Sequence, residues 1–296
     1  MKKNKIFITG ARGFVGKNLV NYCRQHNFIV FNPSRKELDL NNYKKTSLYL
    51  KVHNPDFIVH LASRTIPRIN SSVEYKKQFH DTINPTINIA MAASKKLKML
   101  ISLGSIEEYG QCKTPFLESM IPKPNSSYGL AKVQSFFYFK KICQNKKIRN
   151  IWLRPSLMFG KNMNSNRLIG SIIRSYKYSK ITKILRPKSI RDYLYVDDFS
   201  KVILELIFNY KLFKDELFNI SAENWIQNEK LINKIKQLFG QNKCIILPEA
   251  NNHQQMDKFI SSGSLLKATI PNFNFTKFNK ALTETFISEK IIIRDL

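Results

Sequence analysis

The chain has 296 residues, of which 43% are hydrophobic and 12% aromatic, and a formal net charge of +28 at pH 7. This length allows one large α/β domain and a smaller one, and the apolar content excludes a disordered chain. No stretch approaches the roughly 18 apolar residues of a membrane-spanning helix. The apolar run after the basic start, Ile6-Phe7-Ile8, is also too short for a signal peptide.

The high positive charge has two interpretations. A strongly basic surface is typical of proteins that bind nucleic acid or an anionic membrane. However, the lysines occur as scattered pairs and are not interleaved with aromatic residues that would stack on bases. We therefore expect no nucleic-acid partner and interpret the charge as compositional. A positive field would still attract a phosphate-bearing substrate.

The four cysteines are far apart and form neither a CxxC pair nor a metal-ligand spacing; they are Cys23, Cys112, Cys143 and Cys244. This pattern argues against a disulfide-rich secreted domain and against a zinc module. We expect a reduced, cytoplasmic protein that holds no metal.

Apolar runs alternate with segments of helical periodicity, which predicts an α/β fold with a doubly wound parallel sheet of the Rossmann type. The predicted strands are residues 5–9, 28–31, 57–61, 98–103 and 150–153. The predicted helices are residues 14–26, 43–53, 73–94 and 127–145. Residues 191–198 read as a strand that enters a helix running to about Asn209, and shorter elements follow.

The helix predicted after Ser127 carries four consecutive aromatic residues, Phe136, Phe137, Tyr138 and Phe139. One face of a helix cannot bury all four. Either this helix packs on two sides within one chain, or one side meets a partner subunit.

A glycine-rich turn joins the first predicted strand to the first predicted helix. Gly10, Gly13 and Gly16 stand at this turn. Glycines there let the backbone turn tightly and approach a pyrophosphate, which the N–H groups and dipole of the following helix stabilise. The turn therefore predicts a dinucleotide site.

A second motif, Tyr128-Gly129-Leu130-Ala131-Lys132, starts the helix predicted at residues 127–145. Its phenol and ammonium are four residues apart, so both lie on one face of the helix. Such a pair beside a dinucleotide is suited to moving a proton during hydride transfer.

Together, these motifs resemble the extended short-chain dehydrogenase/reductase family, the NAD(P)-dependent epimerases, dehydratases and reductases of nucleotide sugars. The resemblance covers about residues 4–210 and includes the GxxGxxG spacing after Thr9. Supporting segments follow in the family's order: Asp39-Leu40, His60-Leu61-Ala62-Ser63, Asn84, the stretch 104–110, Arg154-Pro155 and Arg191-Asp192-Tyr193.

The resemblance implies a catalytic set of Ser105, Tyr128 and Lys132. Tyr128 would exchange a proton with a sugar hydroxyl or carbonyl, and Ser105 would hydrogen-bond the reacting oxygen. Lys132 and the positive nicotinamide would lower the pKa of the phenol towards neutrality. The residues implied at the cofactor are Gly10, Arg12, Gly13, Phe14, Val15, Gly16, Arg35, Asp39, Leu40, Leu61, Ala62, Ser63, Tyr128, Lys132 and Pro155.

The end of the second predicted strand bears on cofactor choice. NAD-binding sites place a carboxylate there for the ribose 2′-hydroxyl, whereas NADP-binding sites use arginine. Residues 30–35 contain no acid, and Arg35 and Arg12 are suited to a 2′-phosphate. We expect NADP, with NAD as the alternative.

Two further residues are implied at the substrate. Glu107 occupies the position at which the family's 4,6-dehydratases carry the carboxylate that removes the C5 proton. Its alternative role is that of an acid at a helix start, where negative charge is favoured. Arg191 matches the arginine that grips the nucleotide diphosphate. Leu157, however, replaces an asparagine that helps many relatives to hold this phosphate.

We therefore expect a cytoplasmic, homodimeric reductase of a 4-keto-6-deoxy nucleotide sugar that serves surface-polysaccharide biosynthesis. A C4 epimerase is the first alternative and a 4,6-dehydratase the second. A non-catalytic member that binds nucleic acid is the alternative from another class, against which the intact catalytic set argues. We assign residues 1–156 and 190–212 to the Rossmann domain. Residues 157–189 and 213–296 are assigned to a smaller α/β substrate-binding region.

Overall fold

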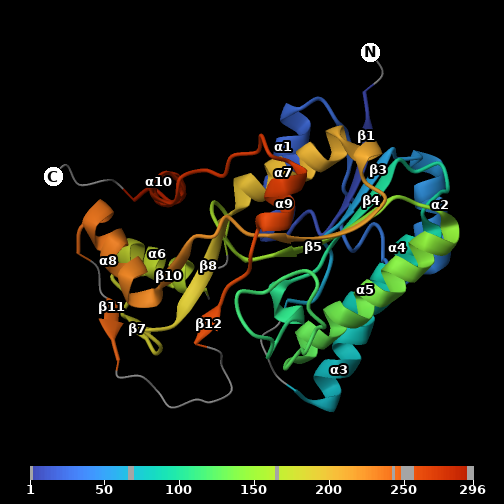
Figure 1. The fold of residues 1–296 in the computed structure, drawn as a ribbon. Coiled ribbons are helices and arrows are strands. Elements are labelled where there is room, and N and C mark those ends of the chain that lie inside the picture. Colours follow the sequence, from blue (N-terminus) through green and yellow to red (C-terminus); the bar gives the residue numbers. More distant parts are fainter. Residues whose placement is uncertain (1–2, 66–69, 164–166, 242–243, 248–256, 292–296) are drawn as a thin grey trace.

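The computed structural model describes residues 3–65, 70–163, 167–241, 244–247 and 257–291. Its central sheet has six parallel strands: β1 (Lys5–Thr9), β2 (Ile29–Phe31), β3 (Phe57–His60), β4 (Met99–Leu103), β5 (Asn150–Pro155) and β9 (Asp215–Ile220). Their spatial order is β2-β1-β3-β4-β5-β9, so the direction of winding reverses between β1 and β3. Strands β1, β3, β4 and β5 of this sheet are labelled in Figure 1. Doubly wound sheets bind ligands beyond the carboxyl ends of the strands at such a switch point.

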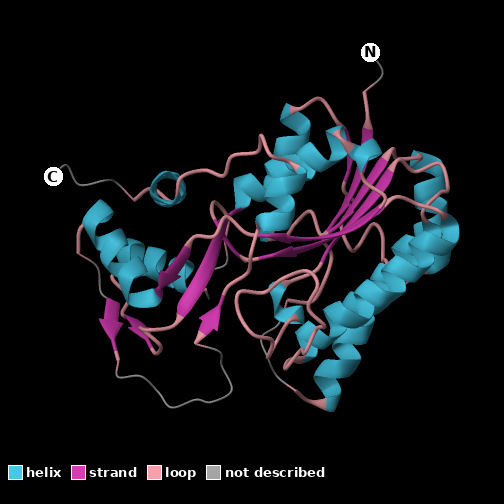
Figure 2. Cartoon of the chain, in the orientation of Figure 1, coloured by secondary structure: helices cyan, strands magenta, loops and turns pink. Residues whose placement is uncertain are grey.

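Helices cover both faces of this sheet (Figure 2). One face carries α1 (Phe14–Gln25), α7 (Val196–Phe208) and α9 (Ser264–Thr269), and the other carries α2 (Tyr43–His53), α4 (Asn84–Ala92) and α5 (Ser127–Lys146). Successive strand residues point to opposite faces, so Ile6 and Ile8 enter one core and Phe7 the other. Burial on both faces explains why these strands read as continuous apolar runs. The predicted α/β Rossmann fold is confirmed.

The prediction of one continuous helix at residues 73–94 is wrong. The structure has three segments there: α3 (Ser72–Gln78), a π-helix η1 (Phe79–Ile83) and α4. Pro85 stands in the first turn of α4 and has no amide hydrogen to donate to the preceding turn. The wider π turn before it accommodates this missing donor.

A smaller region with its own core adjoins the carboxyl ends of β5 and β9. Its four-stranded sheet contains β6 (Leu157–Phe159), β8 (Ile190–Tyr195), β10 (Trp225–Gln227) and β12 (Lys258–Phe259). A separate pair is formed by β7 (Thr182–Ile184) and β11 (Cys244–Ile246). Its helices are α6 (Leu168–Tyr178), α8 (Asn228–Phe239) and α10 (Phe278–Ser288). Two short 3-10 helices complete the described elements: η2 (Ile106–Glu108) and η3 (Tyr210–Leu212).

Two strands lie in a different sheet from the one expected from the predicted domain boundaries. β8 belongs to the smaller sheet, although residues 190–212 were assigned to the Rossmann domain. β9 belongs to the central sheet, although residues 213–296 were assigned to the smaller region. Parallel pairing of β9 with β5 along six residues places it there, and this pairing joins segments that are distant in sequence.

The aromatic run of α5 is divided between core and surface. Phe139 is buried, and the half-buried Phe136 ring lies 5.5 Å from that of Trp152. Phe137 and Tyr138 are 60% and 51% exposed. The described residues of one chain therefore leave these two side chains uncovered.

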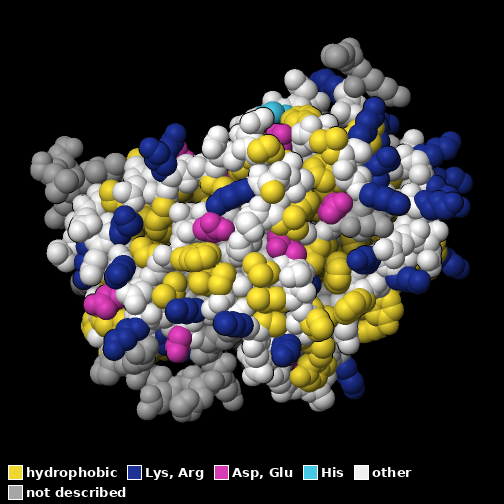
Figure 3. All heavy atoms as spheres, viewed as in Figure 1, with side chains coloured by type: hydrophobic (Ala, Val, Ile, Leu, Met, Phe, Trp, Pro, Cys, Tyr) yellow, Lys and Arg dark blue, Asp and Glu magenta, His cyan; other side chains and the backbone are white. Residues whose placement is uncertain are grey.

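Basic side chains are dispersed over the face seen in Figure 3, among uncharged and hydrophobic ones. Within the described residues, no helix has both the length and the apolarity to span a membrane. The same residues contain no group of three or more His, Cys, Asp or Glu side chains placed to hold a metal.

Candidate active site

The glycine turn lies at the switch point of the sheet. Gly10 has φ +68°, and a Cβ there would lie 2.8 Å from the amide nitrogen of Ala62. A Cβ on Gly16 would lie 2.3 Å from the carbonyl oxygen of Gly10. Gly13 is less confined, because a Cβ there would lie 3.3 Å from that same oxygen. No side chain caps the start of α1. Two glycines therefore close the turn, while the third leaves the start of α1 accessible to a phosphate.

A hydrogen-bond chain behind this turn holds β1 and β3 together. Thr9 Oγ1 accepts from the N–H groups of Leu61 and Ala62, each at 3.1 Å, and faces His60 Nδ1 at 2.8 Å. His60 Nε2 meets Thr86 Oγ1 at 3.2 Å, and Thr86 donates to the carbonyl of Thr82. Burial lowers the pKa of His60 to about 3, so the ring is neutral and links the threonines. The chain positions the predicted cofactor residues Leu61 and Ala62.

The two arginines predicted at a 2′-phosphate are exposed, and each lies near an acid. Arg35 forms an ion pair with Asp81 at 3.0 Å and is 71% exposed. Glu37 accepts a hydrogen bond from the N–H of Ser34, which lowers its pKa, and the charge of Arg12 lowers it further. Arg35 follows β2, and Arg12, in the turn after β1, lies near enough to Glu37 for their charges to interact. The nearby Asp39 accepts from the N–H of Asn41.

Ser105 begins the turn that follows β4. Its hydroxyl accepts from the N–H of Glu107, and its own N–H donates to Glu108 Oε1 at 2.9 Å, which forms a capping box. The Ser105 side chain also lies close enough to the phenol of Tyr128 to lower its pKa. Two of the three predicted catalytic side chains are therefore neighbours.

Tyr128 lies in the first turn of α5 and is half-buried. Burial and the carboxylate of Glu107 raise the pKa of its phenol, whereas Arg167 and the Ser105 side chain lower it. The sequence predicts that Lys132 and a positively charged nicotinamide lower this pKa. Among the described residues, the cation that lowers it is Arg167 at the start of α6, which sequence reasoning did not identify.

Lys132 is 3% exposed and therefore differs from a solvated surface lysine. Its Nζ donates to the carbonyl oxygen of Leu103 at 2.6 Å and lies 5.8 Å from the centre of the Tyr128 ring. Burial lowers the pKa of Lys132 to about 8, and the carboxylate of Glu108 acts in the opposite direction. A proton is thus exchangeable at this amine near neutral pH.

Arg191 lies on β8, in the smaller sheet. Its Nη1 donates to the carbonyl oxygens of Ile190 at 2.8 Å and Asp257 at 3.2 Å. The adjacent Asp192 is fully buried and accepts from the hydroxyls of Ser156, Ser221 and Ser261. These serines follow β5, β9 and β12, so Asp192 joins the two sheets where they meet.

The carboxyl ends of the parallel strands bring most of the predicted residues to one edge of the sheet. These are the glycine turn after β1, Leu61 to Ser63 after β3, Ser105 and Glu107 after β4, and Pro155 at the end of β5. Sequence reasoning missed the chain of Thr9, His60 and Thr86, and the buried Glu108. Glu108 had a signal, because Ser105 and Glu108 have the spacing of a capping box.

This fold and site define a class, the dinucleotide-dependent enzymes with a glycine turn at the sheet's switch point. The sequence matches the NAD dependent epimerase/dehydratase family over residues 6–221. The chain belongs to this family and is an NAD(P)-dependent enzyme of the nucleotide-sugar oxidoreductases and epimerases.

Three similar proteins extend the comparison. GDP-6-deoxy-D-talose 4-dehydrogenase from Aggregatibacter actinomycetemcomitans is 32% identical over 228 residues, 73% of this chain and 74% of that one. GDP-L-colitose synthase from Yersinia pseudotuberculosis is 29% identical over 233 residues, 70% and 73% of the two chains. The structure of UDP-glucose 4-epimerase from Thermotoga maritima shares the fold, with a TM-score of 0.84, 19% identity and coverage of 97% and 98%.

Proposed function

We propose that this chain is an NADP-dependent reductase of a 4-keto-6-deoxy nucleotide sugar. The observation that carries the proposal is the grouping of Ser105, which lies close enough to the Tyr128 phenol to lower its pKa, with Lys132, which is buried one helical turn away. The two sequence relatives support the substrate class, since both names refer to GDP-linked sugars and one refers to oxidation or reduction at C4.

The glycine turn fits the pyrophosphate of a dinucleotide. The start of α1 has no side-chain cap, and Gly13 places no side chain in front of it. The amide groups of Phe14, Val15 and Gly16 would hold the phosphates there. Arg12, in the glycine turn, and Arg35, after β2, would select NADP through the 2′-phosphate. The bound nicotinamide would supply the hydride.

The residues around Tyr128 would handle the proton. Ser105 would donate a hydrogen bond to the keto oxygen and hold it beside the phenol, which would deliver its proton as negative charge develops on that oxygen. Lys132, with a pKa of about 8, would stabilise the phenolate that remains. Arg191 would bind the diphosphate of the substrate from the smaller sheet.

The decisive experiment follows the hydride. A reductase consumes one NADPH for each product, because the hydride stays on the sugar. We expect 4-deuterated NADPH to transfer one deuterium to the sugar in each turnover of a 4-keto-6-deoxy nucleotide sugar. Product formed without NADPH loss and without label would contradict the reductase and indicate an epimerase or a dehydratase.

A 4,6-dehydratase is the alternative that one observation favours. Glu107 lies close enough to the Tyr128 phenol to raise its pKa, as expected of an acid that shares the reaction space. Glu107→Gln separates the alternatives: a dehydratase should lose its activity, whereas a reductase or a C4 epimerase should largely keep it.

We also propose a homodimer formed through α5. Phe137 and Tyr138 are exposed on this helix, and the adjoining α3 and η1 expose Tyr75 and Phe79. Large apolar side chains gathered on neighbouring helices are typical of an interface, and symmetric dimers are the commonest assembly. Light scattering should give twice the chain's 34.6 kDa, and Phe137→Asp should shift it to the monomer mass.

A further inference from the structure

A second carboxylate, Glu108, lies behind the candidate catalytic turn and has no part in the proposed reaction. Its side chain is fully buried. Oε1 accepts from the N–H of Ser105 and from Trp152 Nε1, each at 2.9 Å, and Oε2 accepts from Arg154 Nε at 2.7 Å. Because Trp152 and Arg154 both belong to β5, the carboxylate joins the turn after β4 to the neighbouring strand.

The backbone that precedes Ser105 is also closely held. A Cβ on Gly104 would lie 2.2 Å from Trp152 Nε1 and 2.3 Å from Glu108 Oε1, so only glycine fits between them. The N–H of Gly104 donates to the carbonyl of Leu153, and the carbonyl of Leu103 accepts from Lys132. Three consecutive residues thus determine the positions of the Lys132 amine and the Ser105 hydroxyl.

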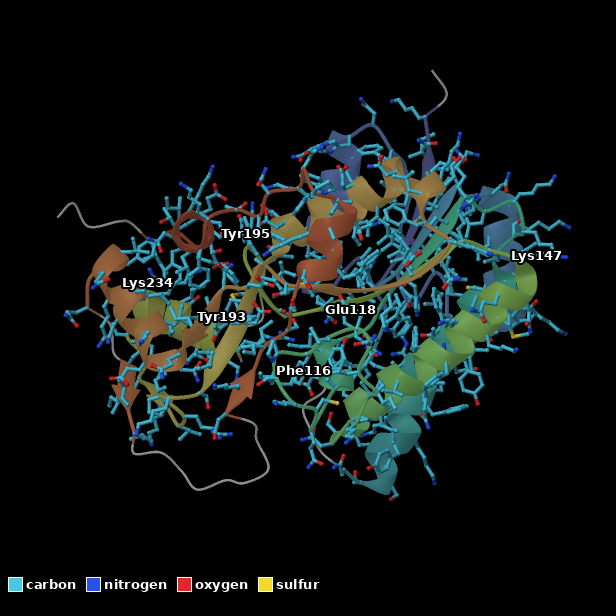
Figure 4. The ribbon with its side chains drawn as sticks, in the orientation of Figure 1. Phe116, Glu118, Lys147, Tyr193, Tyr195 and Lys234 are labelled. Atoms are coloured by element: carbon cyan, nitrogen blue, oxygen red, sulfur yellow. The ribbon has the colours of Figure 1, made fainter. Side chains whose placement is uncertain are left out.

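The ion pair between Glu108 and Arg154 is built into a larger polar network. The Arg154 guanidinium lies 4.6 Å from the centre of the Tyr109 ring, and Tyr109 donates to Asn219 Oδ1 on β9 at 2.7 Å. Asn219 donates in turn to Glu118 and to the carbonyl of Phe116, which are labelled in Figure 4. The network therefore links the turn after β4 to β5 and β9.

Stability alone is a weak explanation for this buried pair. Desolvation of two charges cancels much of their attraction, and apolar replacements of such pairs are often neutral or stabilising. Arg154 Nη1 also lacks a hydrogen-bond partner among the described residues, which adds to the cost. The ion pair is joined directly to the Ser105 backbone, whose N–H donates to Glu108 Oε1.

We propose that Glu108 is a positioning residue, whose carboxylate holds the Ser105 turn against β5 so that the Ser105 hydroxyl faces the Tyr128 phenol. This inference rests on the proposed roles of Ser105 and Tyr128. The charge of Glu108 has a second effect, because it raises the pKa of both Lys132 and Tyr128. Glu107 and Arg167 also act on the phenol, and both stay in place when Glu108 is changed.

Two variants separate the position of this carboxylate from its charge. Glu108→Gln keeps the length, removes the charge and turns an amide donor towards Arg154 Nε. We expect kcat to fall by roughly ten- to a hundredfold with KM little changed. In the profile of kcat against pH, the limb set by the pKa of Lys132 or Tyr128 should move to lower pH, because the charge of Glu108 raises both pKa values. Glu108→Asp keeps the charge but shortens the side chain, so kcat should fall while that limb stays in place.

The control is Asp198→Asn in α7, on the opposite face of the central sheet. Asp198 is 1% exposed and pairs with Lys201 at 3.0 Å, so it matches Glu108 in burial and charge pairing. The Asp198→Asn substitution should lower the melting temperature without moving this limb of the pH profile. If Glu108→Gln does not fold, the combination of Glu108→Gln with Arg154→Gln removes both charges and should show the same loss of kcat and the same shift.

The outcomes are distinct. A folded Glu108 variant with unchanged kcat and pH profile would overturn the positioning role, as would a loss confined to thermal stability. Full activity in Tyr128→Phe would instead show that the proposed function is wrong, whatever the Glu108 variants do.

Discussion

At the scale of single residues, the candidate site combines a phenol whose pKa is raised with an amine whose pKa is lowered. Burial causes both shifts, because it disfavours the charged form of each group. The Lys132 amine donates to the carbonyl oxygen of Leu103. Because its pKa is lowered to about 8, its proton is exchanged more readily near neutral pH than that of the phenol.

Tyr128→Phe tests the proton donor. The change removes one hydroxyl and should abolish turnover, while cofactor affinity and melting temperature stay near those of the unchanged protein. Tyr178→Phe at the end of α6 is the matched control, because Tyr178 is 63% exposed and lies outside both the candidate site and the proposed dimer face. Steady-state kinetics of both variants check this expectation, and turnover by Tyr128→Phe at the normal rate would contradict it.

Arg12 in the glycine turn and Arg35 after β2 predict a preference for NADPH over NADH. If Arg12 and Arg35 hold a 2′-phosphate, replacing both by Ala should weaken NADPH binding by roughly ten- to a hundredfold and leave NADH binding nearly unchanged. Titration of each cofactor by fluorescence measures this. Lys36→Ala controls for loss of net charge, since Lys36 is also exposed. Equal affinities for NADPH and NADH in the unchanged protein would rule out this role.

At the scale of elements, the turn from β1 to α1 divides its glycines between structure and binding. Gly16 packs against the Gly10 carbonyl, whereas Gly13 has φ −75°, which any residue adopts, and one contact at 3.3 Å. The same motif thus contains one position that needs glycine for packing and one that keeps the helix start open.

A pair of alanine variants tests this division. Gly16→Ala should destabilise the protein by about 1–3 kcal/mol, because the start of α1 must move away from the Gly10 carbonyl. Gly13→Ala should leave the unfolding midpoint nearly unchanged but weaken dinucleotide binding, since its methyl group would meet the pyrophosphate. Thermal unfolding with and without cofactor compares the two. A Gly13→Ala variant that binds normally would contradict the assignment of this helix start.

At the scale of the whole molecule, Asp192 joins the central sheet to the smaller region. Three serine hydroxyls donate to its Oδ2, while Oδ1 has no hydrogen-bond partner among the described residues. Burial raises the pKa of Asp192 to about 6, in spite of these hydrogen bonds. The connection between the two regions therefore favours a protonated carboxyl.

This shift makes stability depend on pH. The folded pKa lies above the unfolded value, so the stabilisation by protonated Asp192 is complete below about pH 4 and is lost as pH rises through about 6. It amounts to at most about 3 kcal/mol. We expect Asp192→Asn to lose less stability than the unchanged protein between pH 5 and pH 8 in urea unfolding. Equal losses in the two proteins would contradict the raised pKa.

The sequence by itself determined the class of fold and predicted most of the residues that meet at the candidate site. Alternating apolar and amphipathic segments predicted five central strands within a few residues. The glycine turn and the Tyr128–Lys132 pair depend on local geometry, namely a strand-to-helix turn and the spacing of one helical turn. Such features can be read from neighbouring residues because neighbouring residues cause them.

Only the tertiary structure decided which distant segments meet. β9 joins β5 through main-chain hydrogen bonds that carry no sequence signature, and β8 pairs in the smaller sheet for the same reason. Glu108 reads as one of two adjacent acids, yet the fold buries it against Trp152 and Arg154 and leaves Glu107 beside the phenol. Burial and pairing across the sheet depend on the packed chain as a whole, so they fixed the partners of Glu108 and the pKa values of Lys132 and Tyr128.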